Sequence, residues 1–210
     1  MFLGGIHLAW DVFSFIGTFA FAVSGAIIAM EEKYDLFGVY ILGIVTAFGG
    51  GALRNVLIGV PPNVLWEQGF LFKVAIISIT IIFLFPKPLL NHWTRWGIYF
   101  DAIGLAAFAV QGALFAVELE LPTSAAVVAA CLTGAGGGII RDVLAGRKPL
   151  VFKRDIYAVW AAAGGFFVAI GLYQYDILLY VLFIVITTLR ILSVHYHWKL
   201  PVNHSLYRKL

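Results

Sequence analysis

The sequence predicts an all-α integral membrane protein with seven transmembrane helices, which form two inverted three-helix repeats and one C-terminal helix. Composition is the first reason: 62% of the 210 residues are hydrophobic and 12% are charged, whereas soluble domains carry about 25% charged residues. The second reason is a set of seven apolar segments, and the third is an internal repeat. A chain this apolar needs lipid around most of its surface.

Seven apolar segments approach about 20 residues, the length that an α-helix needs to cross a bilayer. They lie at residues 9–30, 37–58, 66–85, 98–118, 124–145, 156–173 and 176–195. Charged residues or prolines separate most of them, as at residues 31–35 and at Pro61 and Pro62. The first ten residues contain no Lys or Arg, so they do not resemble a cleavable signal. The first helix is therefore expected to stay in the mature protein.

The basic residues predict the orientation of the chain in the cell (inner) membrane. The N-terminus and the connectors at 59–65, 119–123 and 173–176 would share one face, and they contain no Lys or Arg. The other face would hold ten basic residues: Lys33, Lys87, Arg95, Arg147, Lys148, Lys153, Arg154, Lys199, Arg208 and Lys209. The positive-inside rule then places the N-terminus outside and the C-terminus in the cytoplasm. No basic stripe with interleaved aromatics appears, so no nucleic acid partner is expected.

Two parts of the sequence match at a constant offset of 87 residues. Ala-Phe-Ala-Val-Ser-Gly-Ala at 20–26 corresponds to Ala-Phe-Ala-Val-Gln-Gly-Ala at 107–113, and Gly-Gly-Gly-x-x-Arg-(Asn/Asp)-Val-Leu begins at Gly49 and again at Gly136. Each copy holds three spans, an odd number, so the second copy must cross the membrane upside down. Inverted repeats are common in transport proteins, which bind or conduct near the midplane at the repeat interface.

The repeat predicts three parts of the chain. Residues 1–97 would form the first three-helix repeat with its linker, residues 98–175 the second, inverted repeat, and residues 176–210 the seventh helix with a basic cytoplasmic tail.

A glycine triplet lies within the second span of each copy, at Gly49, Gly50 and Gly51 and at Gly136, Gly137 and Gly138. Glycine in a helix costs about 1 kcal/mol relative to alanine, so a triplet favours a break, whose freed carbonyls would line a polar pathway and attract cations. The alternative is close packing of two helices through small residues. Two triplets in symmetric positions favour the pathway, with breaks expected at both.

Polar side chains near the triplets are further candidates. Arg54 and Arg141 follow the triplets; because a bare cation would repel permeant cations, we interpret them as groups that gate, bind backbone carbonyls or bind lipid. The candidates for lining a pore share equivalent positions in the two copies: Ser24 and Gln111, Thr46 and Thr133, Asn55 and Asp142.

The doubled Gly-Gly-Gly-x-x-Arg-(Asn/Asp)-Val-Leu element, the Phe-Ala-Val-Ser-Gly-Ala stretch and the 3+3+1 layout resemble prokaryotic trimeric intracellular cation (TRIC) channels. Bacterial members of this family are also labelled "glycine transporter domain". The resemblance implies a homotrimer with one hourglass pore in each protomer, around kinked second and fifth helices, and conduction of potassium and also sodium. Animal members bind phosphoinositide near basic residues of the fifth helix, where Asp142 and Val143 here follow Arg141.

We therefore expect a passive monovalent cation channel in contact with membrane lipids. The alternative is a secondary transporter of a small solute such as an amino acid. A channel and a transporter both need a hydrated midplane, so the sequence leaves both open. An intramembrane enzyme finds little support, since neither His-Glu-x-x-His nor Gly-x-Ser-x-Gly is present. No cofactor and no metal site are expected, apart from permeant potassium or sodium.

Overall fold

The computed structural model describes residues 4–85, 93–152 and 156–201, which fold into seven α-helices joined by short 3₁₀ turns. The predicted fold class is confirmed: the protein is an all-α multi-pass membrane protein. Five of the described helices are long and apolar enough to cross a bilayer, and two apolar helices are shorter. The described helices are α1 (Gly4–Glu31), α2 (Leu36–Leu57), α3 (Gly69–Leu84), α5 (Trp93–Glu118), α6 (Thr123–Leu144), α7 (Ala158–Ala169) and α8 (Asp176–His195).

The two short helices differ from the predicted spans at 66–85 and 156–173. The chain after Pro61 forms a 3₁₀ turn, η1 (Pro62–Glu67), so α3 begins only at Gly69. Helix α7 ends at Ala169, because Gly171 takes a φ of +132° and redirects the chain into the turn η3 (Leu172–Gln174). Both helices therefore lose a turn that hydrophobicity alone assigns to them.

The ends of four helices repeat the same backbone geometry in both halves. Gly59 and Gly146 follow α2 and α6 with positive φ angles of 78° and 69°, which glycine adopts without steric cost. Lys33 and Glu120 follow α1 and α5 and also have positive φ angles, of 60° and 54°. Each pair is separated by 87 residues, so the duplication is visible in the turns as well as in the sequence.

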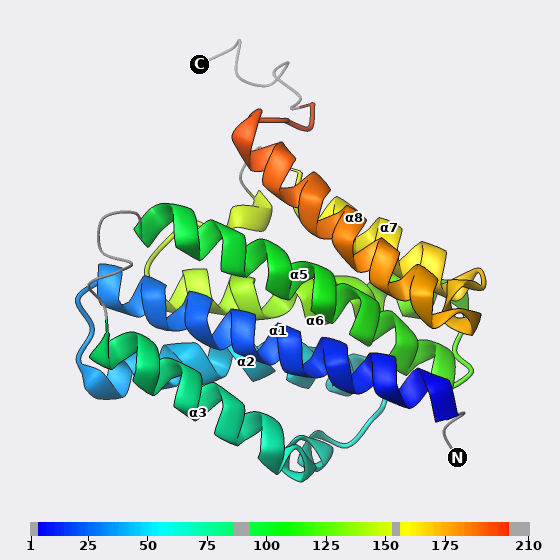
Figure 1. The fold of residues 1–210 in the computed structure, drawn as a ribbon, viewed down its shortest axis with the longest axis horizontal. Coiled ribbons are helices and arrows are strands. Elements are labelled where there is room, and N and C mark those ends of the chain that lie inside the picture. Colours follow the sequence, from blue (N-terminus) through cyan, green and yellow to red (C-terminus); the bar gives the residue numbers. More distant parts are fainter. Residues whose placement is uncertain (1–3, 86–92, 153–155, 202–210) are drawn as a thin grey trace, which may run out of the picture.

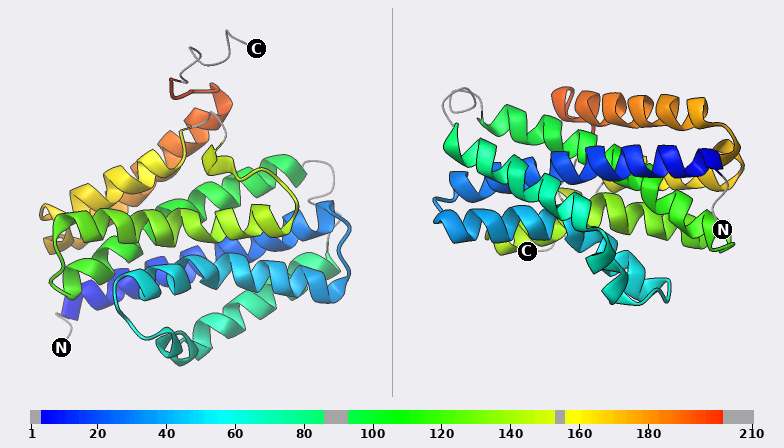
Figure 2. Two further views of the ribbon diagram at one scale, coloured as in Figure 1. Left: turned by 180° about the vertical axis from the view of Figure 1, so that it is seen from behind. Right: turned by 60° about the horizontal axis from the view of Figure 1, so that its bottom comes forward.

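Equivalent helices of the two halves pack against each other at the centre. Helix α1 lies against α5 and α2 lies against α6, and Figure 1 shows α1 and α5 side by side and running in opposite directions. Helix α3 packs on α1 and α2, α7 packs on α5 and α6, and α8 covers α5 and α7. The two views in Figure 2 show α3 and α8 on the outer sides of this centre. The arrangement gives the molecule a pseudo-two-fold axis between its halves.

The connectors after α1 and α6 meet at one end of the molecule, as the alternation of spans requires. Arg147 forms ion pairs with Glu31, at 2.9 Å, and with Glu32, and the Tyr34 hydroxyl donates to the Leu144 carbonyl at 2.8 Å. Partial burial opposes the charged form of Arg147, but the bonds to Glu32 and Glu31 outweigh it and raise its pKa. Of the basic residues used for orientation, Lys87, Lys153, Arg154, Arg208 and Lys209 lie outside the described residues.

Candidate functional site

The glycine triplets mark the crossing of α2 and α6. Both helices run through their triplets without interruption, so the predicted breaks are wrong. A Cβ atom on Gly50 would lie 2.6 Å from the Thr133 carbonyl oxygen, and one on Gly137 would overlap the Thr46 carbonyl oxygen. The backbones approach so closely that only glycine fits at these two positions. The alternative of close packing therefore explains the middle of each triplet, and no carbonyls are freed there.

The two threonines at this crossing bond within their own helices. The Thr46 hydroxyl donates to the Leu42 carbonyl at 2.6 Å and the Thr133 hydroxyl donates to the Ala129 carbonyl at 2.7 Å. Thr46 is fully buried, whereas Thr133 also reaches a small cavity of about 20 Å³ that Gln111 lines too.

Two aromatic rings meet on the pseudo-two-fold axis beside this crossing. Phe21 of α1 and Phe108 of α5 are repeat equivalents, and their ring centroids lie 5.2 Å apart in an edge-to-face arrangement. A Cβ on Gly17 would lie 2.5 Å from the Phe108 ring, and one on Gly104 would overlap the Phe21 ring. Each ring thus fits against a glycine of the other half, which closes the centre of the protein with apolar groups.

Arg141 is held inside the protein by two carboxylates. Its guanidinium lies 2.8 Å from the nearest oxygen of both Asp101 and Asp142, and it donates to the Ser24 hydroxyl at 2.7 Å. The Tyr157 hydroxyl also donates to Asp101, at 3.2 Å. The Arg141 side chain is only 2% exposed, so the positive charge is compensated by buried acids on both sides.

Arg54 occupies the equivalent position in the first half but has neutral partners. It donates to the Asn55 side-chain oxygen, at 2.8 and 3.1 Å, and to the Gln111 side-chain oxygen at 2.9 Å. The guanidinium carbon lies 4.2 Å from the centre of the Phe115 ring. No carboxylate of the described residues forms an ion pair with Arg54, which is 2% exposed.

These contacts correct two of the roles predicted for the arginines, carbonyl binding and lipid binding, and leave gating as a prediction. Neither side chain bonds a backbone carbonyl or lies at the lipid surface, because both are buried and bonded to side chains of α1, α2, α5 and α6.

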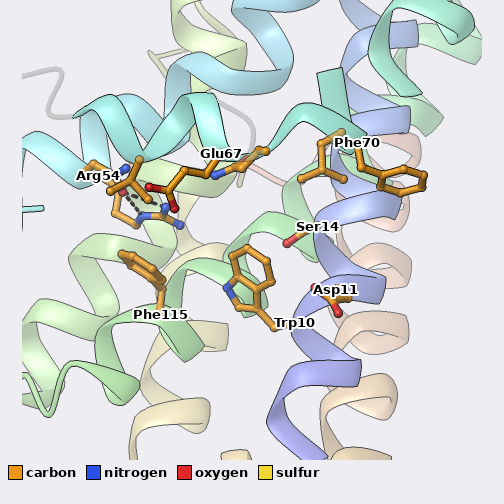
Figure 3. A pocket seen from close by; sticks show the side chains of 11 residues that line it. Trp10, Asp11, Ser14, Arg54, Glu67, Phe70 and Phe115 are labelled. Carbon is orange, nitrogen blue, oxygen red and sulfur yellow. Dashed lines mark hydrogen bonds between the residues drawn. The ribbon is translucent and has the colours of Figure 1, made fainter. Parts of the chain in front are cut away.

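Two pockets lie at opposite ends of the central helices. The Arg54 pocket has a volume of about 520 Å³ and includes Trp10, Ser14, Asn55 and Phe115 in its lining. Figure 3 shows Trp10, Ser14 and Phe115 on the pocket walls with Arg54. The Arg141 pocket has a volume of about 260 Å³ and is lined in part by Ser24, Asp101 and Asp142. Along α1, Phe21 lies between the residues that reach the two pockets, and along α5 Phe108 does.

The comparisons with known proteins agree on one family. Residues 11–87 and 98–174 each match the sequence profile of the family described as glycine transporter, and the two matches start 87 residues apart. The UPF0126 membrane protein YvgT of Bacillus subtilis is 65% identical over 92% of this chain and 96% of its own length. The UPF0126 inner membrane protein YadS of Escherichia coli is 36% identical over 89% of this chain and 92% of its own.

Solved structures add the fold. A prokaryotic TRIC channel crystallised in 0.5 M KCl superposes with a TM-score of 0.82 and 34% identity, over 92% of this chain and all of its own. The chain belongs to the prokaryotic TRIC family. The TRIC trimeric intracellular cation channel orthologue from Rhodobacter sphaeroides also superposes with a TM-score of 0.82, at 28% identity. The match covers 90% of the present chain and 98% of the Rhodobacter chain.

The structure of this TRIC homologue brings together residues that sequence reasoning missed. Asp101, Tyr157 and the Phe21–Phe108 pair complete the centre, but none of them stood out as a site candidate. Asp101 carried a usable signal: it aligns with Ser14 at the offset of 87, as Asp142 aligns with Asn55. Both substitutions place an acid in the second half where the first half is neutral.

Proposed function

We propose that this protein is a passive channel for monovalent cations, chiefly potassium and also sodium, with one pore in each protomer of a homotrimer. One observation carries the proposal: pockets at opposite ends of α1 and α5 are separated by the Phe21–Phe108 pair and the α2–α6 crossing. A path between the pockets would cross the pseudo-two-fold axis, because the rotation about that axis exchanges one pocket with the other. The conformation described here is closed at that axis.

The charges of the Arg141 pocket and of the mouth of the Arg54 pocket favour cations. Arg141 is neutralised by Asp101 and Asp142, so it offers no bare positive charge to a passing ion. The Arg54 pocket also includes the exposed carboxylates of Asp11 and Glu67, which raise the local concentration of cations near its mouth. Selectivity between potassium and sodium should be weak, because the sequence has no Thr-Val-Gly-Tyr-Gly filter with stacked carbonyl rings.

The names of similar structures support the same function. The conductance of TRIC cation channels is the subject of a structure that is 37% identical over 92% of this chain and 96% of its own, with a TM-score of 0.78. The Rhodobacter sphaeroides structure is named as a trimeric channel. We extend conduction and the trimer to this chain as part of the proposal, together with membrane lipid as its surroundings and a cytoplasmic C-terminus.

A secondary transporter of a small solute is the second candidate. Inverted repeats with a closed centre between two pockets also suit alternating access, in which the halves rock around a midplane site.

Recording from the purified protein in planar bilayers separates the two candidates. A channel gives discrete currents, with a reversal potential near that of potassium under a KCl gradient. A reversal potential near that of chloride would mean that the positive charge of Arg54 governs the path and that the proposal is wrong. Solute uptake without discrete currents would favour the transporter. A carrier must change conformation in every cycle, and domain motions on the μs–ms timescale keep its turnover too slow for discrete currents.

The trimer is tested separately. Light scattering in detergent should give about three times the 23.0 kDa chain mass; a stable monomer would contradict the trimer.

A further inference from the structure

The two buried arginines sit in equivalent positions with unequal partners. In the second half, Arg141 bonds the carboxylates of Asp101 and Asp142. In the first half, the same two positions hold Ser14 and Asn55, which are neutral. A buried guanidinium without a negative partner is strongly unfavourable. The first half therefore lacks a carboxylate beside its buried arginine, whereas the second half has two.

Unused hydrogen-bond donors surround Arg54 on the side of its pocket. The Ser14 hydroxyl, the Asn55 side-chain amide nitrogen and the Trp10 indole nitrogen are buried atoms with no hydrogen-bond partner. Ser14 and Asn55 are 2% and 1% exposed, and all three residues line the Arg54 pocket. Arginine has five N–H donors, of which Arg54 uses three. All of these donors belong to residues that line one pocket, and every one of them suits an acceptor of negative charge.

We propose that the Arg54 pocket binds a small carboxylate, in the position that the Asp101 carboxylate takes beside Arg141. The carboxylate would accept from Arg54, Ser14, Asn55 and Trp10. Two oxygens in one plane match the fork of a guanidinium better than a single spherical ion does. The pocket volume of about 520 Å³ lies within the range of small-molecule sites.

The walls of the pocket narrow the class of ligand further. Phe70 and Phe115 offer apolar surface to the hydrocarbon part of the ligand, while Asp11 and Glu67 are exposed lining residues. Their negative charges disfavour anions with several charges, such as phosphate or a tricarboxylate. A monocarboxylate fits both parts of the pocket. This site goes beyond the proposed ion conduction, and it can be tested in protein that conducts nothing.

Acetate is the simplest probe, used with the full-length protein in detergent. Equilibrium dialysis with radiolabelled acetate should give saturable, stoichiometric binding, and the thermal unfolding midpoint should rise with acetate more than with chloride at equal ionic strength. Two variants should abolish both effects: Arg54→Gln removes the cation, and Ser14→Asp supplies an internal carboxylate. The reciprocal double variant, Asp101→Ser with Asp142→Asn, makes the second half resemble the first at both positions and should gain a second acetate.

Each outcome decides the proposal. Absence of saturable acetate binding to the wild-type protein overturns it, and so does an equal response to chloride. Retained binding in Arg54→Gln overturns the placement beside the arginine. If Ser14→Asp does not fold, the dialysis result on the wild-type protein and on Arg54→Gln remains decisive.

Discussion

The rings of Phe21 and Phe108 meet edge to face across the pseudo-two-fold axis, with their centroids 5.2 Å apart. Each residue belongs to a different half of the chain, yet the two occupy the same position in the repeat. Only at such an axis can a residue contact its own repeat equivalent. The pair, like the contact between Gly50 and Gly137, therefore marks a place where both halves must move for the pockets to connect.

Removing either ring should open the centre. Phe21→Ala leaves a cavity on the axis, so we expect a higher open probability in single-channel recordings, at a cost of about 3–5 kcal/mol in stability. Phe13→Ala is the matched control: Phe13 is buried on the same helix but contacts Tyr180 and Phe183 of α8. It should lose comparable stability with unchanged gating. Equal gating effects in both variants would mean that stability alone governs opening.

The glycines within one triplet should tolerate alanine unequally. Gly50→Ala places a methyl group against the Thr133 and Leu132 carbonyls, at 2.6 and 2.7 Å, so α2 and α6 must separate and the unfolding temperature should fall. Gly51→Ala has no neighbour closer than 3.9 Å and should gain up to about 1 kcal/mol from helix propensity. Thermal unfolding in detergent compares them. A stable Gly50→Ala would remove the argument for close packing.

The two buried arginines should differ in their contribution to stability. Arg141→Gln leaves Asp101 and Asp142 buried without a cation, which costs about 3–5 kcal/mol. Arg54→Gln leaves only neutral side chains, so its loss should be smaller. The difference appears in unfolding temperatures measured in buffer without carboxylates. The opposite order would show that Arg54 has an acidic partner that the described residues do not include.

The orientation of the chain is a separate prediction. Reporters fused to either terminus should place the N-terminus outside and the C-terminus in the cytoplasm, because of the ten basic residues on one face and none on the other. A reporter that works only in the cytoplasm should be active after Leu210 and inactive before Met1. The reverse pattern would place the Arg54 pocket on the cytoplasmic side.

The sequence was sufficient to predict the helices and the repeat, because hydrophobic length and a constant offset of 87 residues are local and countable properties. It was not sufficient to predict what the glycines do. A glycine triplet is compatible with a break in its helix and with close packing against another helix. The positions of the Thr46 and Thr133 carbonyl oxygens, each next to a glycine of the facing helix, decide in favour of close packing. The arginines were similarly ambiguous, since a buried partner such as Asp101 lies 40 residues away in the chain.

The matching turns at Gly59 and Gly146 have a consequence for how such a chain arose. A left-handed cap has the same geometry on either side of a membrane, so it does not depend on the direction in which a segment enters the bilayer. Direction is then left to the loop charges, and a few substitutions there can reverse one half without disturbing its internal contacts. An ancestral single half could thus insert both ways and pair with itself, before gene fusion made the two directions permanent and let the two copies differ at positions such as Ser14 and Asp101.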